Sequence, residues 1–189
     1  MSIIGKSAPE FSGQAALNGE VVKISLSDYR GKWVVLVFYP LDFTFVCPTE
    51  LVAFSDRHAD FKAINAEIIG ISVDSVHTHL AWTRTPRSEA GVGELAYPLF
   101  ADLDKSVCAA YDVLHGPVAL RGVFIINPEG TVHSATINNL PVGRSVDEVL
   151  RAVKAYQYVE KTGNVCPANW QEGQEGMKAT LEGVKSVIG

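Results

Sequence analysis

The residues with the clearest capacity for chemistry in this sequence are its three cysteines, Cys47, Cys108 and Cys166. Cys47 is followed by Pro48 and then by apolar residues at helical spacing, so we expect it at the N-terminus of a helix. The free backbone N–H groups and the dipole of a helix N-terminus favour a thiolate over a thiol. The sequence therefore predicts that Cys47 is a nucleophile.

A second cysteine has the same neighbours as the first, because Val-Cys-Pro occurs at both Cys47 and Cys166. An oxidised cysteine, a sulfenic acid, condenses readily with a thiol, which protects it from further oxidation. Cys166 is therefore the candidate resolving thiol, and the sequence leaves open whether it pairs within one chain or between two. Cys108 lies on the face of a predicted helix, and we expect it to pack in the core.

Other uses of these thiols find little support in the spacing. The sequence contains no Cys-x-x-Cys pair, which argues against both a zinc site and a thioredoxin-type dithiol exchanger, although His77 and His79 form a short pair. A Cys/His hydrolase would need a base near Cys47, and His58 is better explained as a residue on a helix surface. We therefore expect neither a metal nor a cofactor.

Composition limits the classes of protein that the chain can be. Its 189 residues, 47% hydrophobic and 20% charged, suit a single globular domain. We expect residues 1–163 to form this domain and the turn-rich, polar residues 164–189 to form a tail. A net charge of −5 argues against nucleic-acid and anionic membrane partners. Without a leader or a long apolar run, the pattern predicts a cytosolic protein with reduced thiols.

The elements that must position these cysteines follow an α/β pattern. Asn18-Gly19, between two β-favouring runs, predicts an N-terminal hairpin, and the strands on either side of the Cys47 helix favour a right-handed parallel crossover. The order is βαβ followed by ββα, with a hairpin in front and a C-terminal extension, which is the thioredoxin-like arrangement. Strands are predicted over residues 15–17, 21–24, 32–39, 67–73, 122–126 and 131–137, and helices over 47–64, 76–84, 105–114 and 145–163.

The segment from Pro40 to Cys47, Pro-Leu-Asp-Phe-Thr-Phe-Val-Cys, resembles the Pro-x-x-x-Thr/Ser-x-x-Cys signature of peroxiredoxins. The resemblance is to the typical two-cysteine subgroup, which includes the peroxidatic subunits of bacterial alkyl hydroperoxide reductases, and it covers nearly the whole chain. It implies a thioredoxin-like peroxidase. Further matching segments are Phe38-Tyr39, Pro48–Leu51, Arg121–Ile126, Asn139–Arg144 and Val165–Trp170.

The resemblance implies that Cys47 is the peroxidatic cysteine, which attacks one peroxide oxygen, becomes a sulfenic acid and releases water or an alcohol. Such a reaction needs fixed donors and a permanent cation around the O–O bond. Arg121 is the matching cation, because a guanidinium stays protonated and presents a planar fork. Thr44 carries a hydroxyl that can donate and accept, as a positioned peroxide requires.

The remaining roles come from the resemblance alone. It implies that Pro40 shields the thiolate from water, and that Glu50 and Arg144 orient the arginine. It also implies a Cys47–Cys166 disulfide between the subunits of an antiparallel dimer, with five dimers in a ring. The substrates would be hydrogen peroxide and organic hydroperoxides, and the function antioxidant defence and redox homeostasis.

Two questions stay open at this level. The reductant is either thioredoxin or a flavoprotein disulfide reductase, because no short motif distinguishes the two. A chaperone ring is a second class of function, which peroxide consumption with a dithiol reductant would separate from an enzyme. In some members of the family that this chain resembles, sensitivity to overoxidation goes with a Gly-Gly-Leu-Gly loop and a Tyr-Phe pair on the C-terminal helix. Here residues 90–93, Ala-Gly-Val-Gly, keep only part of that loop, and the Tyr-Phe pair is missing. We therefore expect relative resistance to overoxidation, measurable by mass spectrometry of Cys47 after a peroxide pulse.

Overall fold

The computed structural model describes residues 2–188. The chain forms two compact units, Met1–Val146 and Asp147–Gly189. This division falls near the start of the helix Val146–Thr162, whereas the sequence placed its boundary after that helix. The functional division into a peroxidase domain of residues 1–163 and a tail of residues 164–189 stays a prediction.

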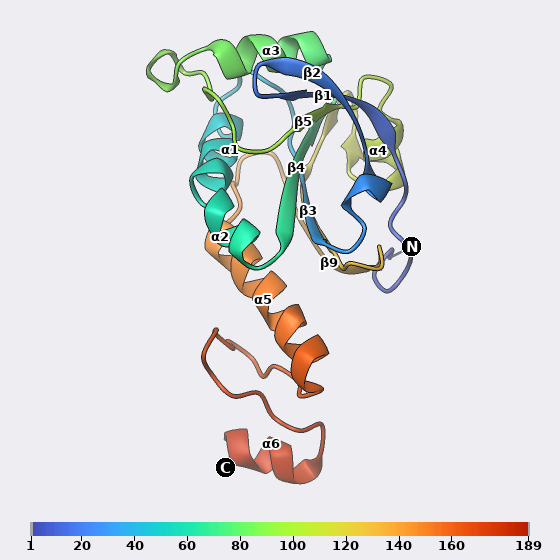
Figure 1. Ribbon diagram of the computed structural model, residues 1–189, viewed down its shortest axis with the longest axis vertical. Helices are drawn as coiled ribbons and strands as arrows, with labels where there is room; N and C mark the ends of the chain where they lie inside the picture. The colour runs from blue at the N-terminus through green and yellow to red at the C-terminus, as the bar shows by residue number, and fades with distance from the viewer. Residues whose placement is uncertain (1, 189) are drawn as a thin grey trace. The chain divides into compact units, whose positions relative to one another are not determined.

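The first unit is built on a seven-stranded sheet with the order β2-β1-β5-β4-β3-β8-β9 (Figure 1). Strands β3, β4 and β5 are parallel, while β8 joins the other edge of β3 antiparallel. Every residue of the central strand β3 is buried, as expected where both faces of a sheet are covered. The strands are β1 Ser12–Leu17, β2 Glu20–Ser25, β3 Trp33–Phe38, β4 Ala66–Ser72, β5 Leu99–Ala101, β8 Arg121–Ile126 and β9 Val132–Asn138, with a separate pair β6 Leu114–His115 and β7 Val118–Ala119.

Helices cover both faces of this sheet: α1 and α2 lie on one side and α4 on the other (Figure 1). On the α4 side, the ring of Phe38 packs 5.2 Å from that of Tyr111 and 5.5 Å from that of Phe124. This architecture confirms the expected thioredoxin-like α/β class. The helices are α1 Cys47–Asp56, α2 His58–Ala63, α3 Val76–Arg84, α4 Ser106–Ala110, α5 Val146–Thr162 and α6 Leu181–Ile188, with short 3-10 turns at Leu26–Tyr29 and Arg87–Glu89.

Both predicted hairpins are confirmed. Asn18 and Gly19 connect β1 to β2 with φ angles of +51° and +75°, the left-handed pair that a two-residue turn between twisted strands requires. Strands β8 and β9 pair antiparallel across the second turn, where Gly130 has a φ of +84°. That hairpin places Arg121, the first residue of β8, next to the central strand.

The structure corrects two of the predicted helices and adds elements that the sequence analysis did not predict. The helix predicted over residues 47–64 breaks at Arg57 into α1 and α2, and the break brings the rings of Phe54 and Phe61 to 6.2 Å. Seven residues of continuous helix would separate them by a rise of about 10 Å. Helix α4 is shorter than the segment predicted over residues 105–114, and the three-residue strand β5 and helix α6 were missed. Strand β5 is too short to show a periodicity.

In the second unit, the chain after α5 folds back onto that helix. Arg151 donates from Nη1 to the carbonyl oxygen of Trp170 at 2.9 Å, and the Trp170 ring lies 5.1 Å from that of Tyr158. The hydroxyl of Tyr158 accepts from the backbone N–H of Gly176 at 2.7 Å. The segment that carries Cys166 is therefore attached to α5 by specific contacts.

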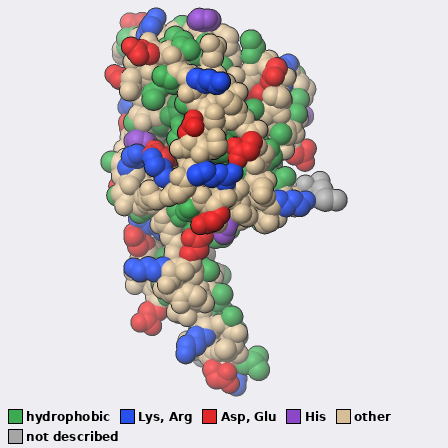
Figure 2. Space-filling model, turned by 45° about the vertical axis from the view of Figure 1, so that its right-hand side comes forward, with side chains coloured by type: hydrophobic (Ala, Val, Ile, Leu, Met, Phe, Trp, Pro, Cys, Tyr) green, Lys and Arg blue, Asp and Glu red, His purple; other side chains and the backbone are tan. Residues whose placement is uncertain are grey.

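Three properties of the described residues concern binding to other molecules: surface charge, membrane-spanning helices and metal-binding clusters. Basic and acidic side chains are interspersed on the face shown in Figure 2. Among residues 2–188, no helix combines the length and apolar character needed to cross a bilayer. The same residues contain no cluster of histidine, cysteine and carboxylate side chains suited to a metal ion.

Candidate active site

Cys47 is the first residue of α1, and its side chain is fully buried. Val46 precedes it as the N-cap with helical dihedral angles and without a capping side chain. Pro48 therefore occupies the second helical position, one place later than the sequence suggested, because the backbone is already helical at Val46. This position suits proline, because the first backbone N–H groups of a helix have no partner within the helix.

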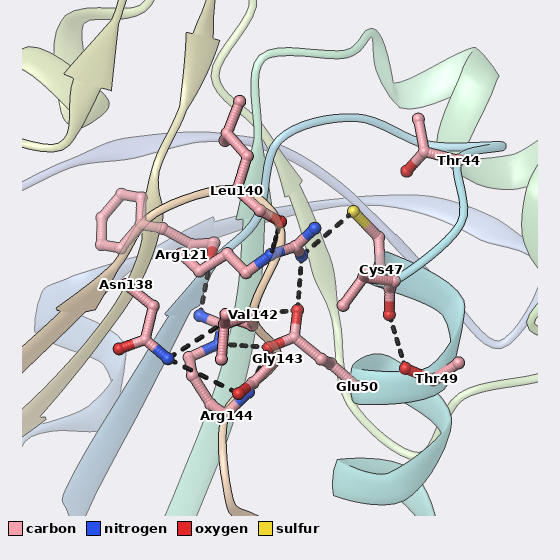
Figure 3. A network of polar contacts seen from close by, with 12 residues as sticks. Thr44, Cys47, Thr49, Glu50, Arg121, Asn138, Leu140, Val142, Gly143 and Arg144 are labelled. Carbon is pink, nitrogen blue, oxygen red and sulfur yellow. Dashed lines mark hydrogen bonds and ion pairs between the residues drawn. The ribbon is translucent and has the colours of Figure 1, made fainter.

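Arg121 reaches the sulfur from the start of β8 (Figure 3). Its Nη1 lies 3.4 Å from Cys47 Sγ and 2.6 Å from Glu50 Oε2, while Nε donates to the carbonyl oxygen of Leu140 at 2.7 Å. Only 4% of Arg121 is exposed, so its charge is poorly screened by water. The guanidinium thus places a permanent cation against the thiol sulfur.

Glu50 lies one turn after Cys47 on α1 and joins two arginines. Its Oε1 accepts from the backbone N–H and from Nε of Arg144, at 2.8 and 2.7 Å, and its Oε2 accepts from Arg144 Nη2 at 3.0 Å and from Arg121. Two guanidinium groups and one carboxylate carry a net charge of +1. The cluster therefore places one excess positive charge, buried, beside the sulfur of Cys47.

Arg144 connects this cluster to the sheet. Its Nη1 donates to the carbonyl oxygens of Phe38, at the end of β3, and Gly122, near the start of β8, at 2.6 and 2.7 Å. Gly143 sits so close to α1 that a Cβ there would lie 3.3 Å from the side chain of Val46 and 3.5 Å from that of Glu50. The two charged residues expected to orient Arg121 are thus both in contact with the site.

Sequence reasoning missed one functional group, the carbonyl oxygen of Leu140. It accepts from Arg121 Nε at 2.7 Å and so determines which edge of the guanidinium faces the sulfur. Every residue has a backbone carbonyl, so the side chain at this position carried no information about the role. The only clue was that Leu140 lies within the segment Asn139–Arg144, which resembles the family.

Thr44 and Pro40 lie on the loop that leads into α1. The hydroxyl of Thr44 donates to the carbonyl oxygen of Leu41 at 2.8 Å, which leaves its oxygen able to accept a further hydrogen bond. Thr44 is half-buried, whereas Pro40 is buried directly after the end of β3. The structure therefore places both residues near Cys47 along the chain and engages the threonine hydroxyl with the loop itself.

The other two cysteines lie in contrasting surroundings, and all three are free thiols. Cys108 is fully buried in the core, which confirms its expected packing role, and burial together with Asp102 holds the pKa of its thiol far above the ordinary range. Cys166 is half-buried in the second compact unit, with Sγ 3.7 Å from the carbonyl oxygen of Ala155. Burial raises the pKa of its thiol, and the charge of Arg151 opposes this rise.

Comparisons with known proteins match this chain almost from end to end. The model of the AhpC/TSA family matches residues 4–135, and that of the C-terminal domain of 1-Cys peroxiredoxin matches residues 155–189. Peroxiredoxin-2 of Rattus norvegicus is 54% identical over 96% of this chain and 93% of its own length. The chloroplastic 2-Cys peroxiredoxin BAS1 of Hordeum vulgare is 52% identical over 98% and 90%.

A solved structure agrees over the full chain. The reduced 2-Cys peroxiredoxin of Plasmodium vivax superposes with a TM-score of 0.96 at 44% identity, covering 100% of this chain and 99% of its own. Relatives of this similarity share both the fold and the chemistry of a reactive thiol. The chain therefore belongs to the peroxiredoxins of the AhpC/TSA family and is a thiol peroxidase of the two-cysteine class.

Proposed function

We propose that Cys47 is the peroxidatic cysteine of this enzyme, acting on hydrogen peroxide and organic hydroperoxides. The observation that carries the proposal is the buried sulfur at the start of α1, 3.4 Å from Arg121 Nη1 in a cluster with excess positive charge. The thiolate attacks one peroxide oxygen and the O–O bond breaks. Cys47 becomes a sulfenic acid, and the departing oxygen takes a proton and leaves as water or an alcohol.

The residues around Cys47 would bind the peroxide and stabilise the negative charge that develops on its departing oxygen. Arg121 touches the sulfur and can donate to the peroxide, because its fork carries several N–H donors. Thr44 can donate to the peroxide oxygen that the sulfur attacks, by giving up its bond to the Leu41 carbonyl. Pro40 would exclude water from the sulfur, while Glu50 and Arg144 hold the guanidinium in place.

Cys166 would complete the cycle. Its thiolate attacks the sulfenic sulfur of Cys47, which forms a disulfide and releases water. A disulfide needs the two sulfurs about 2 Å apart, and Cys47 is fully buried, so the first turn of α1 has to unwind locally. We place this disulfide between two subunits of an antiparallel dimer, and a dithiol reductant, thioredoxin or a flavoprotein disulfide reductase, would restore both thiols.

The assembly and compartment follow as further parts of the proposal. We expect homodimers that associate into a ring of five, which sedimentation of the reduced and oxidised protein would test. We also propose a cytosolic setting, on the ground that three sparse, widely spaced cysteines suit a reducing compartment. The antioxidant role follows from removal of peroxides.

Mapping the oxidised thiols tests the proposal directly. After one equivalent of hydrogen peroxide, mass spectrometry should find a linked peptide pair containing Cys47 and Cys166, with Cys108 still a thiol. Burial protects Cys108, because the thiolate is the reactive form and its pKa is far above the working range. Primary oxidation at Cys108, or a disulfide that leaves out Cys47, would contradict the assignment.

Replacing Arg121 with methionine should lower the second-order rate of Cys47 oxidation by about 100-fold or more, which is the scale for loss of one fixed donor to developing negative charge. The fold should survive, since Glu50 keeps Arg144 as a partner. Stopped-flow measurement of the first oxidation gives the rate. Arg87→Met is the matched control, because Arg87 forms an exposed ion pair with Asp56, and it should leave the rate unchanged.

The disulfide step should become faster as pH rises. Burial raises the pKa of Cys166, so its thiolate fraction is small near neutrality and grows about tenfold per pH unit below the pKa. Quenched-flow alkylation from pH 7 upward would measure this. Arg151→Gln removes the charge that opposes the rise, so its rate profile should move to higher pH. A rate independent of pH would show that the Cys166 thiolate does not limit this step.

A further inference from the structure

Three buried polar side chains contact one another: Tyr39 just after β3, Asp42 on the loop that leads to Cys47, and His79 on α3. The Tyr39 hydroxyl donates to Asp42 Oδ1 at 2.8 Å, and His79 Nδ1 lies 2.7 Å from Asp42 Oδ2. The exposed fractions are 0% for Tyr39, 6% for Asp42 and 0% for His79. Their hydrogen bonds are separate from those that join Arg121, Glu50 and Arg144 beside the Cys47 sulfur. We call this trio the Asp42 clamp.

The protons of the clamp can be counted from its partners. His79 Nε2 lies 3.2 Å from the carbonyl oxygen of Phe100, which can only accept, so Nε2 carries a hydrogen. One further proton lies between Nδ1 and the carboxyl of Asp42. Burial raises the pKa of Asp42, and its hydrogen bond to His79 opposes this rise. Each oxygen of the buried Asp42 carboxyl thus has a hydrogen-bond partner, as a polar group in a dry interior requires.

The clamp ties one residue of the loop to several parts of the sheet and its helices. The side chain of Asp42 reaches back to the end of β3 and across to α3, while its backbone N–H donates to Asp74 Oδ2 at 2.9 Å. The same Asp74 oxygen accepts from Ser72 Oγ, at the end of β4, at 2.7 Å. The loop is thus anchored at Asp42, five residues before Cys47.

The segment after the clamp is held much more loosely. Phe43 has a φ of +53°, an unfavourable left-handed conformation for a bulky residue, and its ring contacts that of Trp82 at 5.8 Å. Phe45 is 92% exposed, and the N-cap Val46 supplies no capping side chain. A strained and poorly capped segment unwinds readily unless its beginning is anchored. The anchor is the Asp42 clamp.

We propose that Tyr39, Asp42 and His79 are positioning residues that hold the Cys47 loop in its peroxide-reactive arrangement and so decide the fate of the sulfenic acid. The inference rests on the proposed roles of Cys47 and Cys166. The sulfenic acid either condenses with the Cys166 thiol, giving a disulfide and water, or is oxidised by a second peroxide, giving a sulfinic acid and water or an alcohol. The second reaction needs the folded loop and the first needs the unwound one.

The test compares variants of Asp42 in the full-length protein. Reduced protein receives a pulse of hydrogen peroxide and is quenched by alkylation, and mass spectrometry gives the ratio of sulfinic acid to disulfide at Cys47. Asp42→Ala should lower this ratio about tenfold and slow the first oxidation, because it leaves two buried partners without the carboxyl. Asp42→Asn should stay within about twofold of the wild type, since its amide can accept from Tyr39 and donate to Nδ1 of His79.

Two further variants separate positioning from loss of stability. Tyr39→Phe keeps the ring but removes the hydroxyl that contacts Asp42 and His79, and it should lower the ratio about two- to threefold. This variant tests the proposal if Asp42→Ala does not fold. Val132→Ala opens a cavity at a fully buried position on β9 and should lower the melting temperature without changing the ratio.

The outcomes point in distinct directions. The positioning role of the clamp is overturned if the ratio of sulfinic acid to disulfide is unchanged in Asp42→Ala or Tyr39→Phe. It is also overturned if Val132→Ala changes the ratio equally, or if Asp42→Asn behaves like Asp42→Ala. A wild-type protein that forms no Cys47–Cys166 disulfide would instead overturn the proposed function.

Discussion

Replacing Cys47 with serine should lower the rate of peroxide consumption by at least about 1000-fold, since a hydroxyl at this position is not ionised near neutral pH and cannot replace the nucleophile. The change is nearly isosteric and leaves the ion pairs among Glu50, Arg121 and Arg144 in place. Activity would be followed as peroxide loss in the presence of a dithiol reductant.

The matched control for this variant is Cys108→Ser. Cys108 is equally buried, but it lies in the core cluster that includes Phe38 and Tyr111. Its replacement should reduce stability by about 1 kcal/mol, as expected when a buried apolar group is exchanged for a polar one, and leave turnover intact. Substantial turnover by Cys47→Ser would contradict the role of Cys47 as the nucleophile. Loss of turnover in folded Cys108→Ser would show that Cys108 takes part in catalysis.

Replacing Cys166 with serine should stop catalytic cycling after one oxidation. The first reaction needs only the cluster around Cys47, so a single rapid oxidation should remain, with a rate within about twofold of the wild type because no contact of the sulfur changes. The sulfenic acid then has no thiol partner and should persist long enough to be trapped by a dimedone-type reagent at Cys47. Non-reducing gel electrophoresis should show no disulfide-linked dimer.

The same variant also distinguishes the two arrangements of the disulfide. In the wild type, a Cys47–Cys166 bond between subunits runs as a dimer on a non-reducing gel, while a bond within one chain runs as a monomer. Mixing Cys47→Ser and Cys166→Ser proteins should restore one disulfide per mixed dimer if the bond joins two subunits. A linked dimer formed by Cys166→Ser alone would contradict the resolving role.

Local patterns were enough to predict much of the fold. The hairpin at Asn18-Gly19, the buried strand β3 and the helix that begins at Cys47 follow from turn residues, apolar runs and helical spacing, which act over a few neighbouring residues. The same reasoning missed β5, since three residues show no period, and it joined α1 to α2, which the structure separates at Arg57. Strand β5 joins the sheet by pairing with β1 and β4, which lie far from it in sequence.

The candidate site divides in the same way. The sequence by itself pointed to Cys47 as the candidate nucleophile, because a cysteine at a helix start has its chemistry set by adjacent backbone groups. The family resemblance further nominated Arg121, Glu50 and Arg144 without showing how they meet. The order of strands in the sheet decides that meeting: Arg121 lies 74 residues after Cys47, and Arg144 lies 94 residues after Glu50.

Only the tertiary structure decided the geometry around the sulfur and the anchoring of its loop. The antiparallel pairing of β8 with β3 brings the guanidinium of Arg121 to Cys47. The backbone carbonyl of Leu140 accepts from Nε of this guanidinium and so orients it. The contact between Asp42 and His79 crosses 37 residues and joins a loop to α3. The physical reason is that hydrogen bonds and ion pairs depend on distances between elements, whereas residue type and spacing describe one element at a time.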